Sequence, residues 1–342
     1  IDRYRVLADN GQVELSMTPY AHPIVPLLLD LDTAREAMPD ITMPQESGYP
    51  GGRERVDWHI REGLQTFEQY FGQKPTGCWP SEGGISSETL EVLEEHGFTW
   101  AASGESVFRH SMNHKDNSSL ADASLYQAFT RSDSGPACFF RDDGLSDLIG
   151  FTYSDWHADD AVGNLVQHLE NIAASTQAQK NPLVSIILDG ENAWEHFPEN
   201  GYYFLNTLYK KLAEHPGLKM TTYSEYLKDS PQRQSLRTLV SGSWVYGTFS
   251  TWIGDVDKNR GWEMLIDAKQ AFDETVAENT LGSEELLAAQ HQMSICEGSD
   301  WFWWFGDYNP ADSVSDFERL FRVHLSNLYS MLGRQPPEYL SH

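Results

Sequence analysis

The alternation of short apolar segments with helical patterns, from about residue 13 to residue 225, constrains the fold more than any other feature. Short apolar segments bounded by turn residues are typical of buried strands, and strands that alternate with helices are typical of a parallel sheet. The sequence therefore predicts an α/β fold. The expected strands are residues 13–17, 77–79, 99–102, 137–140, 183–188 and 218–222.

Helical segments lie between these strands. Apolar residues recur every three or four positions across residues 56–71, which places them on one helical stripe. The serines at positions 86 and 87 can cap a second helix, which Gly97 ends. Residues 162–172 show the pattern of a third helix, just before the strand expected at 183–188.

A domain boundary is expected at the polar stretch 230–235. Strand signals fade beyond it, and helical patterns such as residues 317–328 take over. We therefore expect an α/β barrel in residues 1–228 and a helical region in residues 229–342. The chain opens without methionine or a signal-peptide pattern, so we expect a segment of a longer protein that lacks its first barrel strand.

Charge and cysteine content limit the partners. The chain has 24 Lys+Arg against 51 Asp+Glu, a net charge of −27, and this field repels nucleic acid and anionic membrane surfaces. No apolar run is long enough for a membrane helix. The three cysteines are widely spaced and predict neither a disulfide framework nor a zinc site. A cytoplasmic location is favoured, with any N-terminal signal missing, and a neutral substrate is compatible with the charge.

Two acidic residues directly follow strand candidates. Glu82 comes after residues 77–79, and Asp189 ends the apolar run 183–188. Carboxyl ends of parallel strands share one face of a barrel, so distant residues can meet there. Retaining glycosidases need two carboxyl groups about 5–5.5 Å apart. A single such Asp would be a helix N-cap, but two sites with a Trp near each favour a catalytic pair.

Four motifs in a fixed order make the chain recognisable. They are GQVELSMTPYAHP at residues 11–23, GCWPSEG at 77–83, LDGENAWE at 188–195 and SDWFWWFGD at 299–307. Together they resemble glycoside hydrolase family 57, especially its amylopullulanase-like and α-amylase-like branch. The resemblance spans nearly the whole chain, and four ordered motifs are more specific than any one of them.

The resemblance implies a retaining enzyme for α-glucans such as starch, glycogen or pullulan, acting on α-1,4 or α-1,6 bonds by double displacement. It implies an incomplete TIM-like (β/α)7 barrel, with a C-terminal helical region that contributes to the active site and no required cofactor. The family's nucleophile falls on Glu82 and its acid/base on Asp189. The family's first motif, His-Gln-Pro, is absent. Hydrolysis and glucan transfer are both left open.

Other polar residues near the motifs are candidates for substrate binding. His22 could donate to a sugar hydroxyl, although a structural role is about as common for such a His. Glu191 could bind a hydroxyl, tune Asp189 or interact with a helix dipole. Arg141 and Asp142 follow the strand expected at 137–140, where an Arg–carboxylate pair bracing the barrel is the favoured interpretation.

Aromatic residues in the motifs are candidates for sugar stacking, with about half of them expected in the core instead. The candidates, with one polar neighbour, are Trp79, Trp252, Trp301, Trp303 and Asp307.

Two other functions compete with a retaining hydrolase. A metal-dependent carbohydrate enzyme, of the polysaccharide deacetylase or α-mannosidase type, needs clustered His and Asp ligands. The chain offers His-x-Asp spacings at His114 and His157, but neither follows a convincing strand. A non-catalytic glucan-binding protein would not need both carboxylates. Calcium is compatible with the acidic loops, but the chain has no EF-hand pattern.

Overall fold

The computed structural model describes residues 1–46, 48–120, 124–190 and 194–341. Its sheet has the strand order β1-β2-β4-β3-β5. The strands are β1 Gly77–Cys78, β2 Trp100–Ser103, β3 Phe129–Thr130, β4 Ala137–Phe140 and β5 Gln234–Ser235. β1, β2 and β4 pair in parallel, which agrees with the predicted alternation of strands and helices. We call the edge of the sheet where these three strands end the carboxyl edge.

The strands expected at residues 13–17, 183–188 and 218–222 do not form full strands. Met17 makes one parallel bridge to Cys78, and Ser185 makes one to Arg141. The segment 218–222 belongs to no strand or bridge. Apolar, β-branched residues favour an extended backbone, but a ladder also needs a neighbour in register, which the sequence of one segment does not specify.

Two short strands were not expected. β3 pairs antiparallel with β4, and β5 pairs in parallel with β3 through Phe129 and Gln234. β5 falls inside the polar stretch where a domain boundary was expected. Both residues of β5 are exposed, so no apolar pattern marks it in the sequence.

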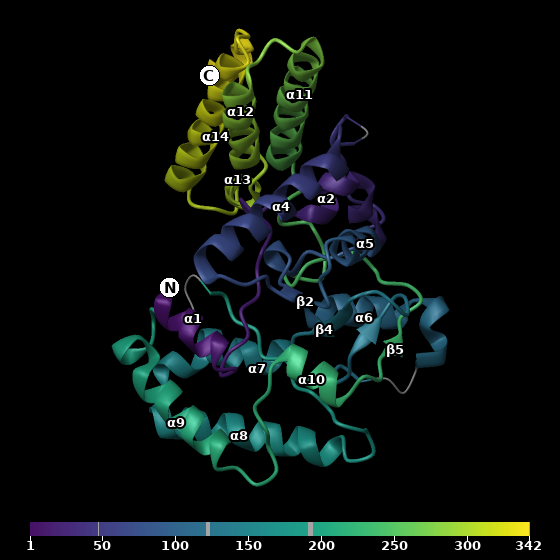
Figure 1. Ribbon diagram of the computed structural model, residues 1–342, viewed down its shortest axis with the longest axis vertical. Helices are drawn as coiled ribbons and strands as arrows, with labels where there is room; N and C mark the ends of the chain where they lie inside the picture. Colours follow the sequence, from purple (N-terminus) through teal and green to yellow (C-terminus); the bar gives the residue numbers. More distant parts are fainter. Residues whose placement is uncertain (47, 121–123, 191–193, 342) are drawn as a thin grey trace.

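The predicted helices are confirmed, and several others accompany them (Figure 1). Ser86 caps α5 by accepting a hydrogen bond from the Thr89 backbone at 3.1 Å. The helices are α1 Asp2–Asp9, α2 Val25–Leu29, α3 Ala34–Ala37, α4 Gly52–Phe71, α5 Ser87–Glu95, α6 Glu105–Asn113, α7 Asp143–Asp147, α8 Ala158–Ser175, α9 Tyr202–Ala213, α10 Tyr223–Asp229, α11 Val256–Glu278, α12 Ser283–Cys296, α13 Ser299–Trp304 and α14 Ala311–Met331.

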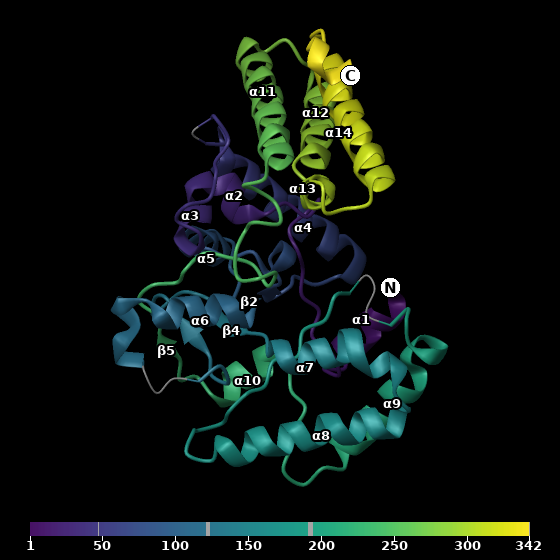
Figure 2. The same ribbon diagram turned by 180° about the vertical axis from the view of Figure 1, so that it is seen from behind.

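The C-terminal helices stand together at one end of the molecule, and α8 and α9 lie side by side at the other (Figures 1 and 2). The largest apolar core joins the sheet to the C-terminal helices. It includes Cys78 of β1, Trp262 of α11, Met293 of α12 and Leu325 of α14. A separate core lies between α8, α9 and the segment 183–188. One apolar core therefore connects the C-terminal helices with β1, the strand that precedes Glu82.

Candidate active site

Glu82 lies just beyond β1, in the short 3-10 turn Ser81–Gly83. Its φ of 58° is in the left-handed region, which is uncommon for a residue with a side chain and is typical of functional sites. Trp244 holds both ends of the residue. Its backbone N–H donates to the Glu82 carbonyl at 3.1 Å, and its indole N–H donates to Glu82 Oε2 at 2.8 Å. The carboxylate therefore has one defined orientation.

The surroundings of Glu82 raise the pKa of its carboxyl group. Burial is the largest cause, while the hydrogen bond from Trp244 and the nearby His22 act in the opposite direction. The carboxylates of Asp189 and Asp300 raise this pKa further. Four residues from separate parts of the chain therefore change the pKa of Glu82. They are Trp244, His22, Asp189 and Asp300.

Asp189 ends the extended segment 183–188, and its side chain is partly buried. Arg141 anchors this segment beside β4, since its Nε donates to the Ile187 carbonyl at 2.9 Å. The Asp142 backbone N–H also donates to the Ser185 carbonyl at 2.8 Å. The segment thus runs parallel to β4 and ends at the carboxyl edge. The charge of Asp189 raises the pKa of Glu82 from there.

His22 joins the C-terminal helices to the carboxyl edge. Its Nδ1 lies 2.8 Å from the hydroxyl oxygen of Ser299, the first residue of α13. The Ser299 backbone N–H donates to the His22 carbonyl at 3.0 Å. His22 has a φ of 58°, so the turn before it is constrained as well. This double link brings Asp300, the next residue of α13, close to Glu82.

Arg141 connects the two carboxylate-bearing segments. It is buried, and its guanidinium pairs with Asp143 at 2.7 Å and Asp147 at 2.5 Å. Its Cζ lies 5.2 Å from the centre of the Trp244 ring that contacts Glu82. The expected bracing pair therefore exists, but with these two carboxylates instead of Asp142.

Asp142 has a different place. Its Oδ1 accepts the Leu145 backbone N–H at 2.8 Å and so caps α7, and its Oδ2 accepts the Tyr126 hydroxyl at 3.0 Å. Both oxygens are used in holding local structure, and the side chain is buried. A direct contact with substrate is therefore not what this side chain is arranged for.

The aromatic candidates separate into two groups. The Trp79 ring lies 5.2 Å from the Trp244 ring, in an edge-to-face arrangement, and is only partly buried. Trp252 has no exposed surface, and the ring of Trp303 lies 6.0 Å away against it. Trp301 packs on Phe321 of α14. Trp79 and Trp301 are thus both partly buried, and only Trp252 lies fully in the core.

No hydrogen bond or ring contact within the described residues links Asp307 or Trp303 to Glu82. Asp307 is exposed, and its charge acts on Asp257 of α11. Glu191 lies outside the described residues. Trp303 is partly buried, and its carbonyl accepts from Asn309 at 3.0 Å.

Sequence reasoning missed three residues of this site, Trp244, Ser299 and Asp300. Ser299 and Asp300 belong to the motif at residues 299–307, so the motif itself was a signal for them. Trp244 lies far from every motif, and only the fold brings it to Glu82.

The model of glycosyl hydrolase family 57 matches residues 1–238 of the chain, which is more than two thirds of its length. The chain belongs to glycosyl hydrolase family 57. It is accordingly an enzyme of the glycoside hydrolase type. No curated protein sequence matches the chain.

Solved structures of family 57 enzymes share the fold. A branching enzyme from the hyperthermophilic archaeon Pyrococcus horikoshii matches with a TM-score of 0.73 at 18% identity, over 99% of this chain and 69% of that one. An α-amylase from Thermotoga maritima matches with a TM-score of 0.67 at 16% identity, over 99% of this chain and 72% of that one. A 4-α-glucanotransferase from Thermococcus litoralis matches with a TM-score of 0.64 at 14% identity, over 96% of this chain and 50% of that one. This family 57 chain thus has a fold of the (β/α)7 barrel class, and a helical region follows the barrel.

The family also bears on the metal-dependent alternative. Among the described residues, no group of three or more His, Cys, Asp or Glu side chains is arranged to hold a metal ion. His114 pairs with Asp116 alone, at 3.5 Å and partly exposed. Membership in a glycosyl hydrolase family favours carboxylate chemistry over a deacetylase. No helix in the described ranges has the length and apolarity to cross a membrane.

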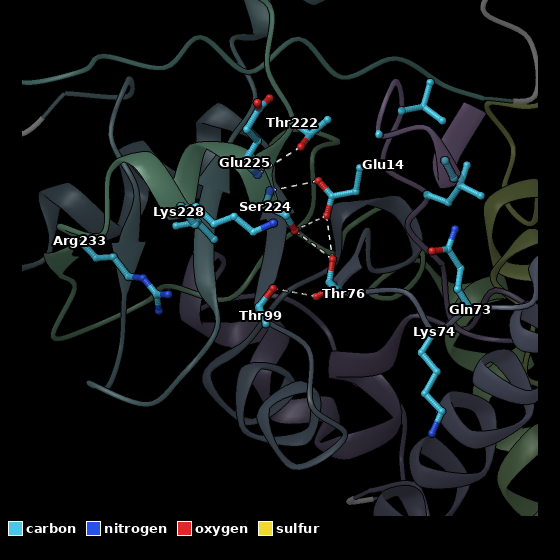
Figure 3. A pocket seen from close by; sticks show the side chains of 15 residues that line it. Glu14, Gln73, Lys74, Thr76, Thr99, Thr222, Ser224, Glu225, Lys228 and Arg233 are labelled. Carbon is cyan, nitrogen blue, oxygen red and sulfur yellow. Dashed lines mark hydrogen bonds between the residues drawn. The ribbon is translucent and has the colours of Figure 1, made fainter. Parts of the chain in front are cut away.

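Two pockets flank the sheet. One of about 400 Å³ is lined by Trp79, Trp100 and the segment 183–188. Another of about 580 Å³ lies by Thr76 and Thr99, which precede β1 and β2. Figure 3 shows Glu14 in this second pocket, bonded to Thr76 and Ser224. Because it lies at the amino ends of the strands, it is not the site that contains Glu82.

Proposed function

We propose that this family 57 enzyme cleaves α-glucans with retention of anomeric configuration, with Glu82 as the nucleophile and Asp189 as the general acid/base. The proposal is supported most by two features: both carboxylates follow segments that run to the carboxyl edge, and the charge of Asp189 raises the pKa of Glu82. Two carboxyl groups that share a site are the arrangement that double displacement needs.

The contact with Trp244 suits Glu82 to the role of nucleophile. Glu82 must be ionised to attack the anomeric carbon, and the indole N–H of Trp244 stabilises its charged form while orienting it. In the first step Glu82 forms a bond to the anomeric carbon, and Asp189 gives its proton to the departing glycosidic oxygen. In the second step Asp189 takes a proton from water, or from a sugar hydroxyl, as that oxygen displaces Glu82.

The substrate class follows from the family and from the aromatic surface. An α-amylase and a 4-α-glucanotransferase share the fold. Trp79 presents a partly exposed ring beside Glu82, and aromatic rings pair well with the apolar faces of sugars. A neutral glucan also tolerates the net charge of −27.

Product analysis on amylose, pullulan and glycogen tests the proposal. We expect reducing ends from hydrolysis, or changed chain lengths from transfer, and equal activity with and without EDTA. Glu82→Gln and Asp189→Asn should each abolish turnover and leave the fold intact. Glu88→Gln, an exposed carboxylate on α5, is the matched control. Glucan binding without any product from the wild-type protein would contradict the proposal and favour a binding protein.

A further inference from the structure

A buried cluster of charged side chains lies between α4 and the start of α13. Glu297, the residue after α12, is 1% exposed and accepts hydrogen bonds from three side chains. Arg55 donates to both carboxylate oxygens, with Nε–Oε1 and Nη2–Oε2 distances of 2.9 Å each. The Tyr49 hydroxyl donates to Oε1 at 2.6 Å, and His59 Nε2 lies 2.7 Å from Oε2.

The charge state of the cluster follows from its hydrogen bonds. Burial alone would raise the pKa of Glu297, but Arg55 and His59 outweigh it and lower this pKa to about 2. His59 Nδ1 faces the Tyr20 carbonyl at 2.6 Å. A carbonyl and a carboxylate both only accept, so both ring nitrogens of His59 donate. Glu297 is therefore an anion that the side chains of Arg55, His59 and Tyr49 hold in place.

The cluster leads directly to the site. His59 is bonded twice to Tyr20, through Nδ1 and through its carbonyl, which accepts the Tyr20 backbone N–H at 3.2 Å. His22 lies two residues after Tyr20, and Ser299 lies two residues after Glu297. His22 and Ser299 are hydrogen-bonded to each other. The cluster therefore fixes both sides of the link that places His22 and Asp300 near Glu82.

We propose that Glu297 is a positioning residue for the reaction at Glu82, and that with Arg55 and His59 it holds the Tyr20–His22 turn and the start of α13 in register with the nucleophile. The inference rests on the proposed function. A buried ion pair contributes little net stability compared with apolar residues of the same volume, whereas its fixed geometry can specify one arrangement. A displacement of about 1 Å in a catalytic constellation can cost about 100-fold in rate.

The test compares Glu297→Gln with Arg322→Gln. Arg322 is also buried in the C-terminal helices and pairs with Glu318 and the Tyr339 carbonyl, but it does not contact the turn. In Glu297→Gln we expect kcat to fall about 10- to 100-fold with KM changed less than about threefold. His22 lowers the pKa of Glu82 by more than Asp300 raises it, so displacement of both should move the acid limb of the pH profile to higher pH. Arg322→Gln should lower the melting temperature and change neither kcat nor the acid limb.

Backbone hydrogen exchange gives a readout that needs no activity. We expect faster exchange in residues 17–24 and 298–304 of Glu297→Gln, and wild-type exchange there in Arg322→Gln. Ser299→Ala, which removes only the hydroxyl bonded to His22, decides the question if Glu297→Gln does not fold, and it should lower kcat and move the acid limb. Wild-type kcat, pH profile and exchange in the folded variant overturn the inference. A wild-type enzyme without activity, but with the expected exchange difference, contradicts only the proposed function.

Discussion

The two carboxylates at the carboxyl edge are held in different ways. Glu82 follows β1, which pairs with β2 at the border of the sheet, and it has a left-handed backbone and receives two hydrogen bonds from Trp244. Asp189 follows a segment that makes a single bridge to the strand beside it, and a small exposed glycine comes next. The backbone of Glu82 is thus held at the end of a paired strand, while the segment before Asp189 depends on Arg141 for its place beside β4.

Loss of each carboxyl group gives the largest expected effect and separates the roles. Glu82→Gln should lower kcat by about 10⁴-fold or more on every substrate. Asp189→Ala should lose as much activity on amylose as Glu82→Gln does. It should regain activity on an aryl α-glucoside with a good leaving group, because that group departs without a proton. Azide should accelerate this variant and yield the α-glucosyl azide, measured by NMR. An α-glucosyl azide from the Glu82 variant, and none from the Asp189 variant, would reverse the assignment.

Trp244→Phe should produce the next largest effect, through Glu82 alone. The lost hydrogen bond to a charged group is worth about 1.5–3 kcal/mol, so kcat should fall about 10- to 100-fold. This bond lowers the pKa of Glu82, so its removal raises that pKa and the acid limb of kcat/KM should move to higher pH. Trp156→Phe, at a partly exposed Trp near α8, serves as the control. An unchanged acid limb would contradict the orienting role.

Arg141→Lys should affect the surroundings of both Glu82 and Asp189. Arg141 donates to the Ile187 carbonyl, near Asp189, and stacks on Trp244, which contacts Glu82. Lys cannot reproduce the planar fork, so we expect about a tenfold loss of kcat with the fold retained. The loss should be less than additive with Trp244→Phe, since both act through one ring. Arg109→Lys, at an exposed Arg paired with Glu105, is the control. Full additivity would show that the two side chains act independently.

The glycines beside the carboxylates should give the smallest effects and the sharpest contrast in stability. Gly83 has a φ of 61°, and a Cβ there would lie 2.8 Å from the Trp79 ring. Gly83→Ala should therefore cost about 1–3 kcal/mol of unfolding free energy. A Cβ on Gly190 meets nothing within 4 Å, so Gly190→Ala should stay within about 0.5 kcal/mol of wild type. Urea denaturation of both variants measures the contrast, and equal losses would contradict it.

Helices and single-residue candidates could be predicted from the sequence, because their signals are local. The apolar stripe across residues 56–71 became α4, and the serine at 86 caps α5 as expected. Strand pairing was less predictable. The segments 183–188 and 218–222 have strand composition, but pairing depends on neighbours that a segment does not encode. The short strand β5 has no apolar signal at all.

The residues of the site also differ in whether the sequence predicts them. Glu82 and Asp189 could be named because each follows an apolar segment within a motif. Trp244 could not, since its contact with Glu82 spans 162 positions of the chain. Trp252 and Trp301 lie in aromatic-rich stretches, and composition alone does not separate a ring that packs against other helices from one that faces a sugar.

Covalent trapping tests the central claim most directly. A 5-fluoro-α-glucosyl fluoride should react with the protein, because its good leaving group permits the first step while the fluorine slows the second. Peptide mass spectrometry should then find one fluoroglucosyl group on Glu82, and none in Glu82→Gln. A label on any other carboxylate, or active enzyme that never forms an adduct, would contradict the account.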